Sequence, residues 1–146
     1  KIVIKFKLSM ESILREVLLD HVKSPKNRGE IEHATISANS NNPVCGDVVK
    51  VDLLIENGFV TEVQTSGKGC AVSQASMSIF SEEISNSSIE DVTLKIREFK
   101  SLFGQESSSV NALSEQSKLL KFLDNNPSKV RCAMLSWLAV EESLTS

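Results

Sequence analysis

Three cysteines and one aspartate are the residues of this 146-residue chain whose types and positions could do chemistry. Cys45 and Asp47 lie in the segment NNPVCGD, whose Asn, Pro and Gly residues predict a turn rather than the interior of a helix. A thiolate and a carboxylate two residues apart can face one ion, because Gly46 lets the backbone bend between them. The segment therefore predicts two ligands for a metal ion.

The other two cysteines are expected at the beginnings of helices. Cys70 follows the sequence GKG, and Cys132 follows the sequence NPS, in which Ser128 is the expected helix cap. Backbone N–H groups near a helix N-terminus favour a thiolate, which is the form that binds metal or attacks sulfur. A single cysteine is more often a buried structural residue, but all three lie beside Gly, Pro or a cationic residue at loop or helix-start positions.

Three sulfur atoms and one carboxylate oxygen suit tetrahedral zinc and include one weaker ligand that can be displaced. Spacing alone is weak support, because the chain lacks the paired Cys-x-x-Cys motifs of a zinc ribbon or finger. The odd number of cysteines argues against a disulfide framework. Metal binding or thiol chemistry is therefore the first interpretation of these residues.

The elements that must position these residues are predicted from apolar periodicity and turn residues. In chain order they are a helix from Met10 that ends near Pro25, a strand over 34–40, a hairpin over 48–66 that turns at Asn57-Gly58, a helix over 70–84, a helix capped by Ser88, a Ser-rich loop over 104–116, a helix through 119–123 and a last helix from Ser128. The predicted fold is α+β, with a small antiparallel sheet of about three strands packed against several helices.

Size, composition and charge point to one ordinary folded domain. With 40% hydrophobic and 24% charged residues, the domain is expected over residues 10–146, and residues 1–9 are expected to be an extension or an expression remnant. The net charge of −3 and the few aromatic residues argue against a nucleic-acid partner. No signal peptide or membrane span is predicted, so the protein is expected in the cytoplasm. His21 is expected to be a surface or helix-capping residue, and His33 a surface residue.

Four segments, DHVKSPKNRGEI, NNPVCGD, GKGCAVSQAS and VRCAMLSW, resemble in order the motifs of the NifU/IscU-type iron–sulfur cluster assembly scaffold proteins, especially their SufU-like branch. The resemblance covers nearly the whole chain. It implies a SufE/NifU-like α+β fold in which Cys45, Asp47, Cys70 and Cys132 gather at one end. These residues are then the ligands of zinc or, alternatively, of iron or a transient [2Fe–2S] cluster.

Two features favour the SufU-like branch. The stretch between Cys70 and Cys132 is long and includes SLFGQESSSVNALSEQ, and Arg131 stands where IscU-like proteins have His. The Leu-Pro-Pro-Val-Lys motif that binds Hsp70-type chaperones is absent from the sequence, so such a chaperone is not an expected partner. SufU-like proteins read Arg, apolar, Lys, Cys at the last site, whereas this chain has Lys129 and Arg131. The guanidinium is therefore at position 131 instead of position 129. This affects any contact that the family's Arg makes with a desulfurase.

The resemblance implies that the protein binds zinc and accepts persulfide sulfur from a SufS-like cysteine desulfurase, as a partner of that enzyme rather than as a stand-alone enzyme. Cys45 is then the sulfur acceptor and Asp47 an exchangeable ligand. The alternative is a U-type scaffold in which Cys45, Cys70 and Cys132 assemble a transient [2Fe–2S] cluster and pass it to apo-proteins. A zinc-stabilised binding module without sulfur chemistry is the third alternative.

Overall fold

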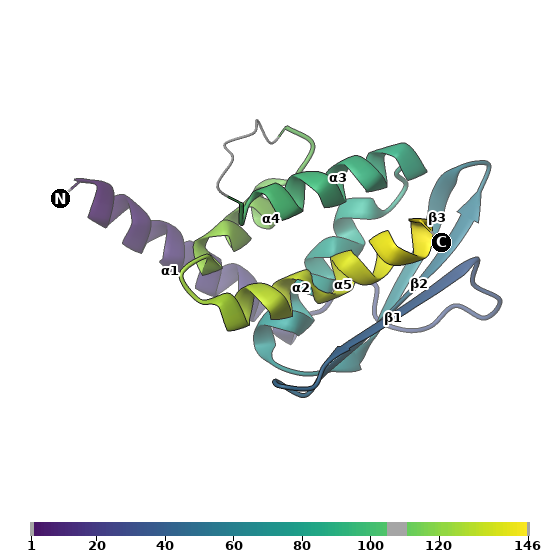
Figure 1. Ribbon diagram of the computed structural model, residues 1–146, viewed down its shortest axis with the longest axis horizontal. Coiled ribbons are helices and arrows are strands. Elements are labelled where there is room, and N and C mark those ends of the chain that lie inside the picture. Colours follow the sequence, from purple (N-terminus) through teal and green to yellow (C-terminus); the bar gives the residue numbers. More distant parts are fainter. Residues whose placement is uncertain (1, 105–110, 146) are drawn as a thin grey trace.

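The chain folds into a three-stranded antiparallel sheet with helices packed against it (Figure 1). The structure, a computed structural model, describes residues 2–104 and 111–145, with side chains from Ser9 onward. Its elements are α1 (Ile2–Lys23), β1 (Ile36–Asn42), β2 (Asp47–Glu56), β3 (Phe59–Lys68), α2 (Ala71–Ile84), α3 (Ile89–Ser101), α4 (Glu115–Leu119), the 3₁₀-helix η1 (Leu120–Leu123) and α5 (Pro127–Thr145). The predicted α+β fold with a small antiparallel sheet is confirmed.

The strand order is β1-β2-β3, and both neighbouring pairs are antiparallel. Asn57 and Gly58 join β2 to β3 with φ angles of 54° and 81°, which is the positive-φ pair of a two-residue type I′ turn. Because β2 and β3 run in opposite directions, the start of β2 lies beside the end of β3. Asp47, the first residue of β2, is thereby brought next to the residues that precede Cys70.

The inner face of the sheet is apolar and is covered by α2 and α5 (Figure 1). Val49, Val51 and Leu53 alternate along β2 and are fully buried, as their period-two spacing predicts. The same spacing would put Ile55 on this face, but the register shifts between Leu54 and Ile55, and Ile55 is only half-buried. The regular part of β2 is therefore the half nearest Asp47.

Trp137 of α5 lies at the centre of the core. Its ring stacks on Phe99 of α3 with a centroid distance of 3.7 Å, and it lies 4.5 Å from the ring of Phe80 of α2. The indole Nε1–H donates to Ser76 Oγ at 3.1 Å. The Trp137 side chain therefore packs α5 against both α2 and α3. The same helix carries Cys132.

Several element ends differ from the prediction. α1 begins at Ile2 rather than at Met10, and its N-terminal half projects away from the sheet (Figure 1). The Ser-rich loop predicted over 104–116 lies partly outside the described residues, and the helix predicted through 119–123 is divided between α4 and η1. No helix within the described residues combines the length and apolar composition needed to cross a membrane.

The start of α5 is a second difference. The helix begins at Pro127, and the Lys129 N–H donates to Asn126 Oδ1 at 3.3 Å, so Asn126 rather than Ser128 caps it. Proline is favoured at the first helical position because it has no N–H that needs a partner there. Ser128 is consequently free to contact the candidate site instead.

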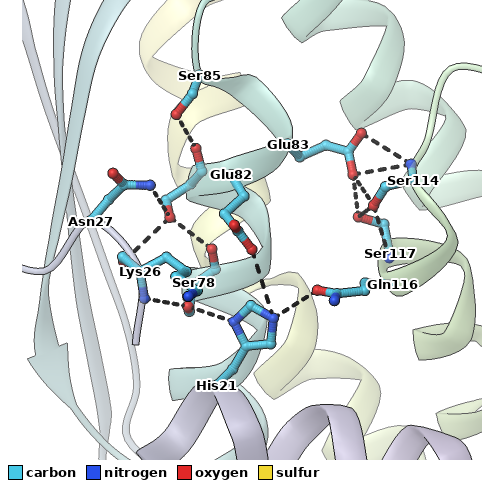
Figure 2. Close-up of polar contacts among 11 residues, drawn as sticks. His21, Lys26, Asn27, Ser78, Glu82, Glu83, Ser85, Ser114, Gln116 and Ser117 are labelled. Atoms are coloured by element: carbon cyan, nitrogen blue, oxygen red, sulfur yellow. Dashed lines mark hydrogen bonds and ion pairs between the residues drawn. The ribbon is translucent and has the colours of Figure 1, made fainter. Parts of the chain in front are cut away.

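His21 is buried, contrary to the prediction of a surface or helix-capping residue, and it connects α1 to α2 and α4 (Figure 2). Nδ1 lies 2.7 Å from Ser78 Oγ, and Nε2 lies 2.7 Å from Gln116 Oε1. The carboxamide oxygen can only accept, so Nε2 carries the hydrogen and Nδ1 accepts from the Ser78 hydroxyl. His33, in contrast, has a 91% exposed side chain, as predicted.

Replacing His21 by Ala is expected to lower the free energy of unfolding by about 1–3 kcal/mol, because the buried Ser78 hydroxyl loses its acceptor. His33→Ala is the matched control, since removing an exposed imidazole should change stability by less than about 0.5 kcal/mol. Urea unfolding followed by circular dichroism measures both variants. Equal unfolding midpoints would contradict a connecting role for His21.

A second polar connection joins α2 to the start of α4 (Figure 2). The Glu83 carboxylate accepts hydrogen bonds from the Ser114 N–H at 3.1 and 3.2 Å and from the hydroxyls of Ser114 and Ser117. Glu83 is only 8% exposed, so these donors offset the cost of burying its charge. These hydrogen bonds thereby hold the start of α4 against α2.

Candidate metal centre

Cys45, Asp47 and Cys132 lie together at the end of the sheet where β2 begins. One ligand atom from each lies within 4.8 Å of the other two. Cys45 comes from the turn between β1 and β2, Asp47 begins β2, and Cys132 comes from α5. Neighbouring sulfur atoms around tetrahedral zinc lie about 3.8 Å apart, given Zn–S bonds of about 2.3 Å. A small contraction would therefore bring these three side chains around one ion.

Cys70, the fourth predicted ligand, is the N-cap residue of α2, as expected. Its N–H donates to Asp47 Oδ1 at 2.8 Å, and its thiol is close enough to Asp47 and Cys132 to affect the pKa of both. Among the described residues, its sulfur is not one of the three atoms within 4.8 Å of one another. The structure thus gathers three predicted ligands tightly and puts Cys70 beside them.

The Asp47 carboxyl is almost completely buried, at 1% exposure. Burial by itself would raise its pKa, but the Cys132 thiol, the Cys70 N–H and the Ser73 hydroxyl hold the pKa below the usual value. Oδ2 is buried and has no N–H or O–H partner among the described residues. Buried carboxylate oxygens normally have partners, so this one fits a site that takes a cation.

Cys132 does not match the predicted thiolate. Because α5 begins at Pro127, Cys132 lies beyond the first helical turn, and its side chain is 1% exposed. Burial, and after it the hydrogen bond to Asp47, raise the pKa of the Cys132 thiol well above its usual value. The expected stabilisation of its thiolate by the helix start was therefore wrong. A metal ion that binds here must displace the thiol proton.

Gly67 and Gly69 allow the connection between β3 and α2 to approach β2 closely. A Cβ on Gly67 would lie 2.0 Å from the Val48 carbonyl oxygen, and a Cβ on Gly69 would lie 2.2 Å from Asp47 Oδ1. Their φ angles of 134° and 151° also favour glycine. The GKG sequence is thus required for the Cys70 N–H to reach the Asp47 carboxylate.

Three polar side chains that contact the ligands were not predicted. They are Ser73, 3.1 Å from Asp47 Oδ1, Asn42, whose Nδ2 is 3.9 Å from Cys132 Sγ, and Ser128, 3.6 Å from Cys45 Sγ. Ser73 has a sequence signal, because it stands three residues after the Cys70 cap and so lies in the first turn of the same helix. Asn42 lies in the NNPVCGD segment and Ser128 near the start of the last helix, but their contacts with the ligands join positions 90 and 83 residues apart, which the sequence does not reveal.

Cys45 is the cysteine held by a turn rather than by a helix. It is half-buried, and the neighbouring Val44 is 81% exposed. Cys132 is buried within α5, although Arg131 next to it is exposed and Lys129 is half-buried. Cys45 and Arg131 are therefore accessible from the surface, whereas Cys132 is not.

Comparisons with known proteins agree with this arrangement. Residues 13–145 match the NifU-like N-terminal domain family. The zinc-dependent sulfurtransferase SufU of Bacillus subtilis is 28% identical over 95% of this chain and 94% of its own length. The iron–sulfur cluster assembly scaffold protein IscU of Thermotoga maritima is 32% identical over 88% of this chain and 90% of its own length. The crystal structure of FiSufU from Fervidobacterium islandicum superposes with a TM-score of 0.83 at 27% identity, covering 88% of this chain and 94% of that one.

The predicted family resemblance is confirmed by these matches, and the SufU relatives support the SufU-like branch. The family match includes all four predicted ligands and extends over both the sheet and the last helix. The chain therefore belongs to the NifU-like N-terminal domain family.

Proposed function

We propose that this protein acts in iron–sulfur cluster assembly by binding one zinc ion and accepting sulfur from a cysteine desulfurase on Cys45. Its family, and its similarity to a zinc-dependent sulfurtransferase, support this role. The observation that carries the proposal is the Asp47 carboxylate. One of its oxygens is buried without an N–H or O–H partner among the described residues, and the carboxylate lies within 4.8 Å of two thiols.

Cys45, Asp47, Cys70 and Cys132 would hold the ion. Three sulfur atoms and one oxygen are ligands that zinc accepts in tetrahedral geometry. A bound zinc ion supplies positive charge that keeps coordinating thiols deprotonated near neutral pH. This matters most for Cys132, because burial raises the pKa of its thiol when no cation balances the thiolate charge.

Sulfur transfer to Cys45 is a thiol–disulfide type of exchange. The Cys45 thiolate attacks the outer sulfur of the desulfurase persulfide, and a new S–S bond forms on Cys45. The original S–S bond breaks, and the desulfurase cysteine leaves as a thiolate, so the step needs no additional oxidant or reductant. Cys45 suits this role because it is half-buried in a turn, whereas Cys132 is 1% exposed.

The partners that follow from this proposal are a cysteine desulfurase as sulfur donor and other assembly factors or apo iron–sulfur proteins as acceptors. The exposed Arg131 beside the site offers a cation for the desulfurase, in a different position from the family's usual arginine. A reducing compartment such as the cytoplasm suits the three free thiols.

A second candidate function is assembly of a transient [2Fe–2S] cluster on the same residues. It is favoured by the 32% identity to the Thermotoga maritima scaffold protein and by the mixed ligand set. An oxygen ligand holds a cluster less firmly than a fourth sulfur would, which suits a cluster that must be passed on.

Metal and acid-labile sulfide content per chain distinguishes the two candidates. On protein purified anaerobically without added metal, we expect about one zinc ion per chain and no sulfide, given the four-ligand site. Iron together with sulfide would assign the protein to the scaffold function. Protein that contains neither metal nor sulfide would contradict the site itself.

Two buried aspartates on β2 provide a matched pair of variants. Within the described part of the chain, Asp47 has an oxygen without an N–H or O–H partner. Asp52, in contrast, is 2% exposed and accepts from the Ile31 N–H at 3.0 Å and the Ser37 hydroxyl at 2.7 Å. In the same metal analysis, Asp47→Asn should lose most of its zinc and Asp52→Asn should retain it. Equal zinc content in both variants would exclude Asp47 as a ligand.

A further inference from the structure

The Asp47 carboxylate is held through one of its two oxygens. Oδ1 accepts the Cys70 N–H at 2.8 Å and lies 3.1 Å from the Ser73 hydroxyl, whereas Oδ2 is buried without an N–H or O–H partner among the described residues. Ser73 is itself 1% exposed. The two oxygens of one carboxylate therefore have different surroundings, and only Oδ2 remains available to a cation.

Gly69 contributes to the same arrangement from the other side. A Cβ at this position would lie 2.2 Å from Asp47 Oδ1 and 2.8 Å from Ser73 Oγ. Any other residue there would push the carboxylate and the hydroxyl apart. The backbone at Gly69, the Cys70 N–H and the Ser73 side chain thus form a cradle around Oδ1.

The Ser73 hydroxyl has one hydrogen and two acceptors, the Asp47 carboxylate at 3.1 Å and the Cys70 carbonyl at 3.0 Å. An ionised carboxylate is the stronger acceptor, because charge-assisted hydrogen bonds are roughly twice as strong as neutral ones. A serine that served only its own helix would bond the carbonyl. The two distances are nearly equal, so the charge on Asp47, rather than the distance, favours the carboxylate as the acceptor.

We propose that Ser73 is a positioning residue that, with the Cys70 N–H, orients Asp47 so that Oδ2 alone faces the metal. This inference rests on the proposed function, because it assumes that Asp47 is a ligand. It also revises the expected role of Asp47 as the exchangeable ligand. A carboxylate held at Oδ1 by two hydrogen bonds stays in place, whereas Cys45 is carried by a turn and its sulfur lies 3.6 Å from the Ser128 hydroxyl.

The test uses Co²⁺ as a spectroscopic probe on the full chain, with chelator competition for affinity. Ser73→Ala should weaken Co²⁺ binding by about 10–100-fold, the usual effect of removing a group that orients a metal ligand. Its d–d absorption should also change in energy and intensity, because the freed carboxylate no longer presents a single oxygen. Ser81→Ala is the matched control, since Ser81 is fully buried on the same helix and bonds Ser78 and Lys26 away from the site.

A double-mutant cycle separates positioning from a general structural effect. Adding Ser73→Ala to Asp47→Asn should cause little further loss of Co²⁺ affinity, because the carboxylate that Ser73 orients is already absent. If Ser73→Ala binds Co²⁺ with wild-type affinity and spectrum, or weakens it equally in both backgrounds, the positioning role is wrong while the metal site stands. If the wild-type protein shows no thiolate-to-cobalt absorption, both the positioning role and the proposed function are wrong.

Discussion

Replacing Cys45 by Ser is expected to reduce sulfur acceptance from a cysteine desulfurase by about two orders of magnitude or more, because a hydroxyl is a far weaker nucleophile than a thiolate. Cys45 is the cysteine on a turn, it is half-buried, and its neighbour Val44 is 81% exposed. A persulfide carried by another protein can reach it there. The measurement is mass spectrometry of tryptic peptides after reaction with desulfurase and cysteine, which detects one added sulfur atom.

Cys132→Ser is the informative comparison for this variant. It removes a predicted ligand that is 1% exposed, so it should weaken metal binding and slow sulfur uptake, but the sulfur that is taken up should still be found on Cys45. Both variants keep an oxygen in place of sulfur, and circular dichroism should show that both remain folded. Sulfur found on Cys70 or Cys132, together with undiminished transfer to Cys45→Ser, would show that the acceptor has been misassigned.

Replacing Trp137 by Ala should lower the free energy of unfolding by about 3–5 kcal/mol, the usual cost of removing a large aromatic side chain from a core. Trp137 is fully buried, stacks on Phe99 at 3.7 Å between centroids, and donates to Ser76 at 3.1 Å. Its loss leaves a cavity among three helices and leaves the buried Ser76 hydroxyl without this donor. Urea unfolding followed by far-ultraviolet circular dichroism is the suitable measurement, because Trp137 is the only tryptophan of the chain.

Two further variants calibrate this loss. Trp137→Phe keeps a stacking ring and gives up the N–H, so its cost should be smaller than that of the Ala variant. Leu138→Ala changes the adjacent residue, which is 38% exposed, and should cost less than about 1 kcal/mol. A Trp137→Ala protein as stable as Leu138→Ala would show that α5 is held mainly by other contacts.

The parts of the fold that the sequence predicts well depend on neighbouring residues. Asn57-Gly58 and the alternation of Val49 and Val51 are local patterns, and they correctly predict the hairpin. The turn that carries Cys45 and leads into Asp47 is predicted for the same reason. These short-range features locate two of the candidate ligands before any long-range contact is considered.

The features that were missed depend on contacts between distant segments. His21 is buried because Gln116, 95 positions away, meets its ring. The pKa of the Cys132 thiol is raised mainly by burial, which helix position alone does not reveal. The start of α5 is a local exception: Asn126 and Ser128 are both good caps, and the intervening Pro127 favours Asn126.

The candidate ligands come from the turn before β2, the start of α2 and the last helix. During translation, Cys45, Asp47 and Cys70 therefore emerge from the ribosome well before Cys132. A nascent chain cannot complete the four-ligand site until α5 has been synthesised and has packed against α2 and the sheet. Loading with metal is thus tied to the completion of the polypeptide, and an unfinished chain exposes its thiols without being able to hold an ion with the full set.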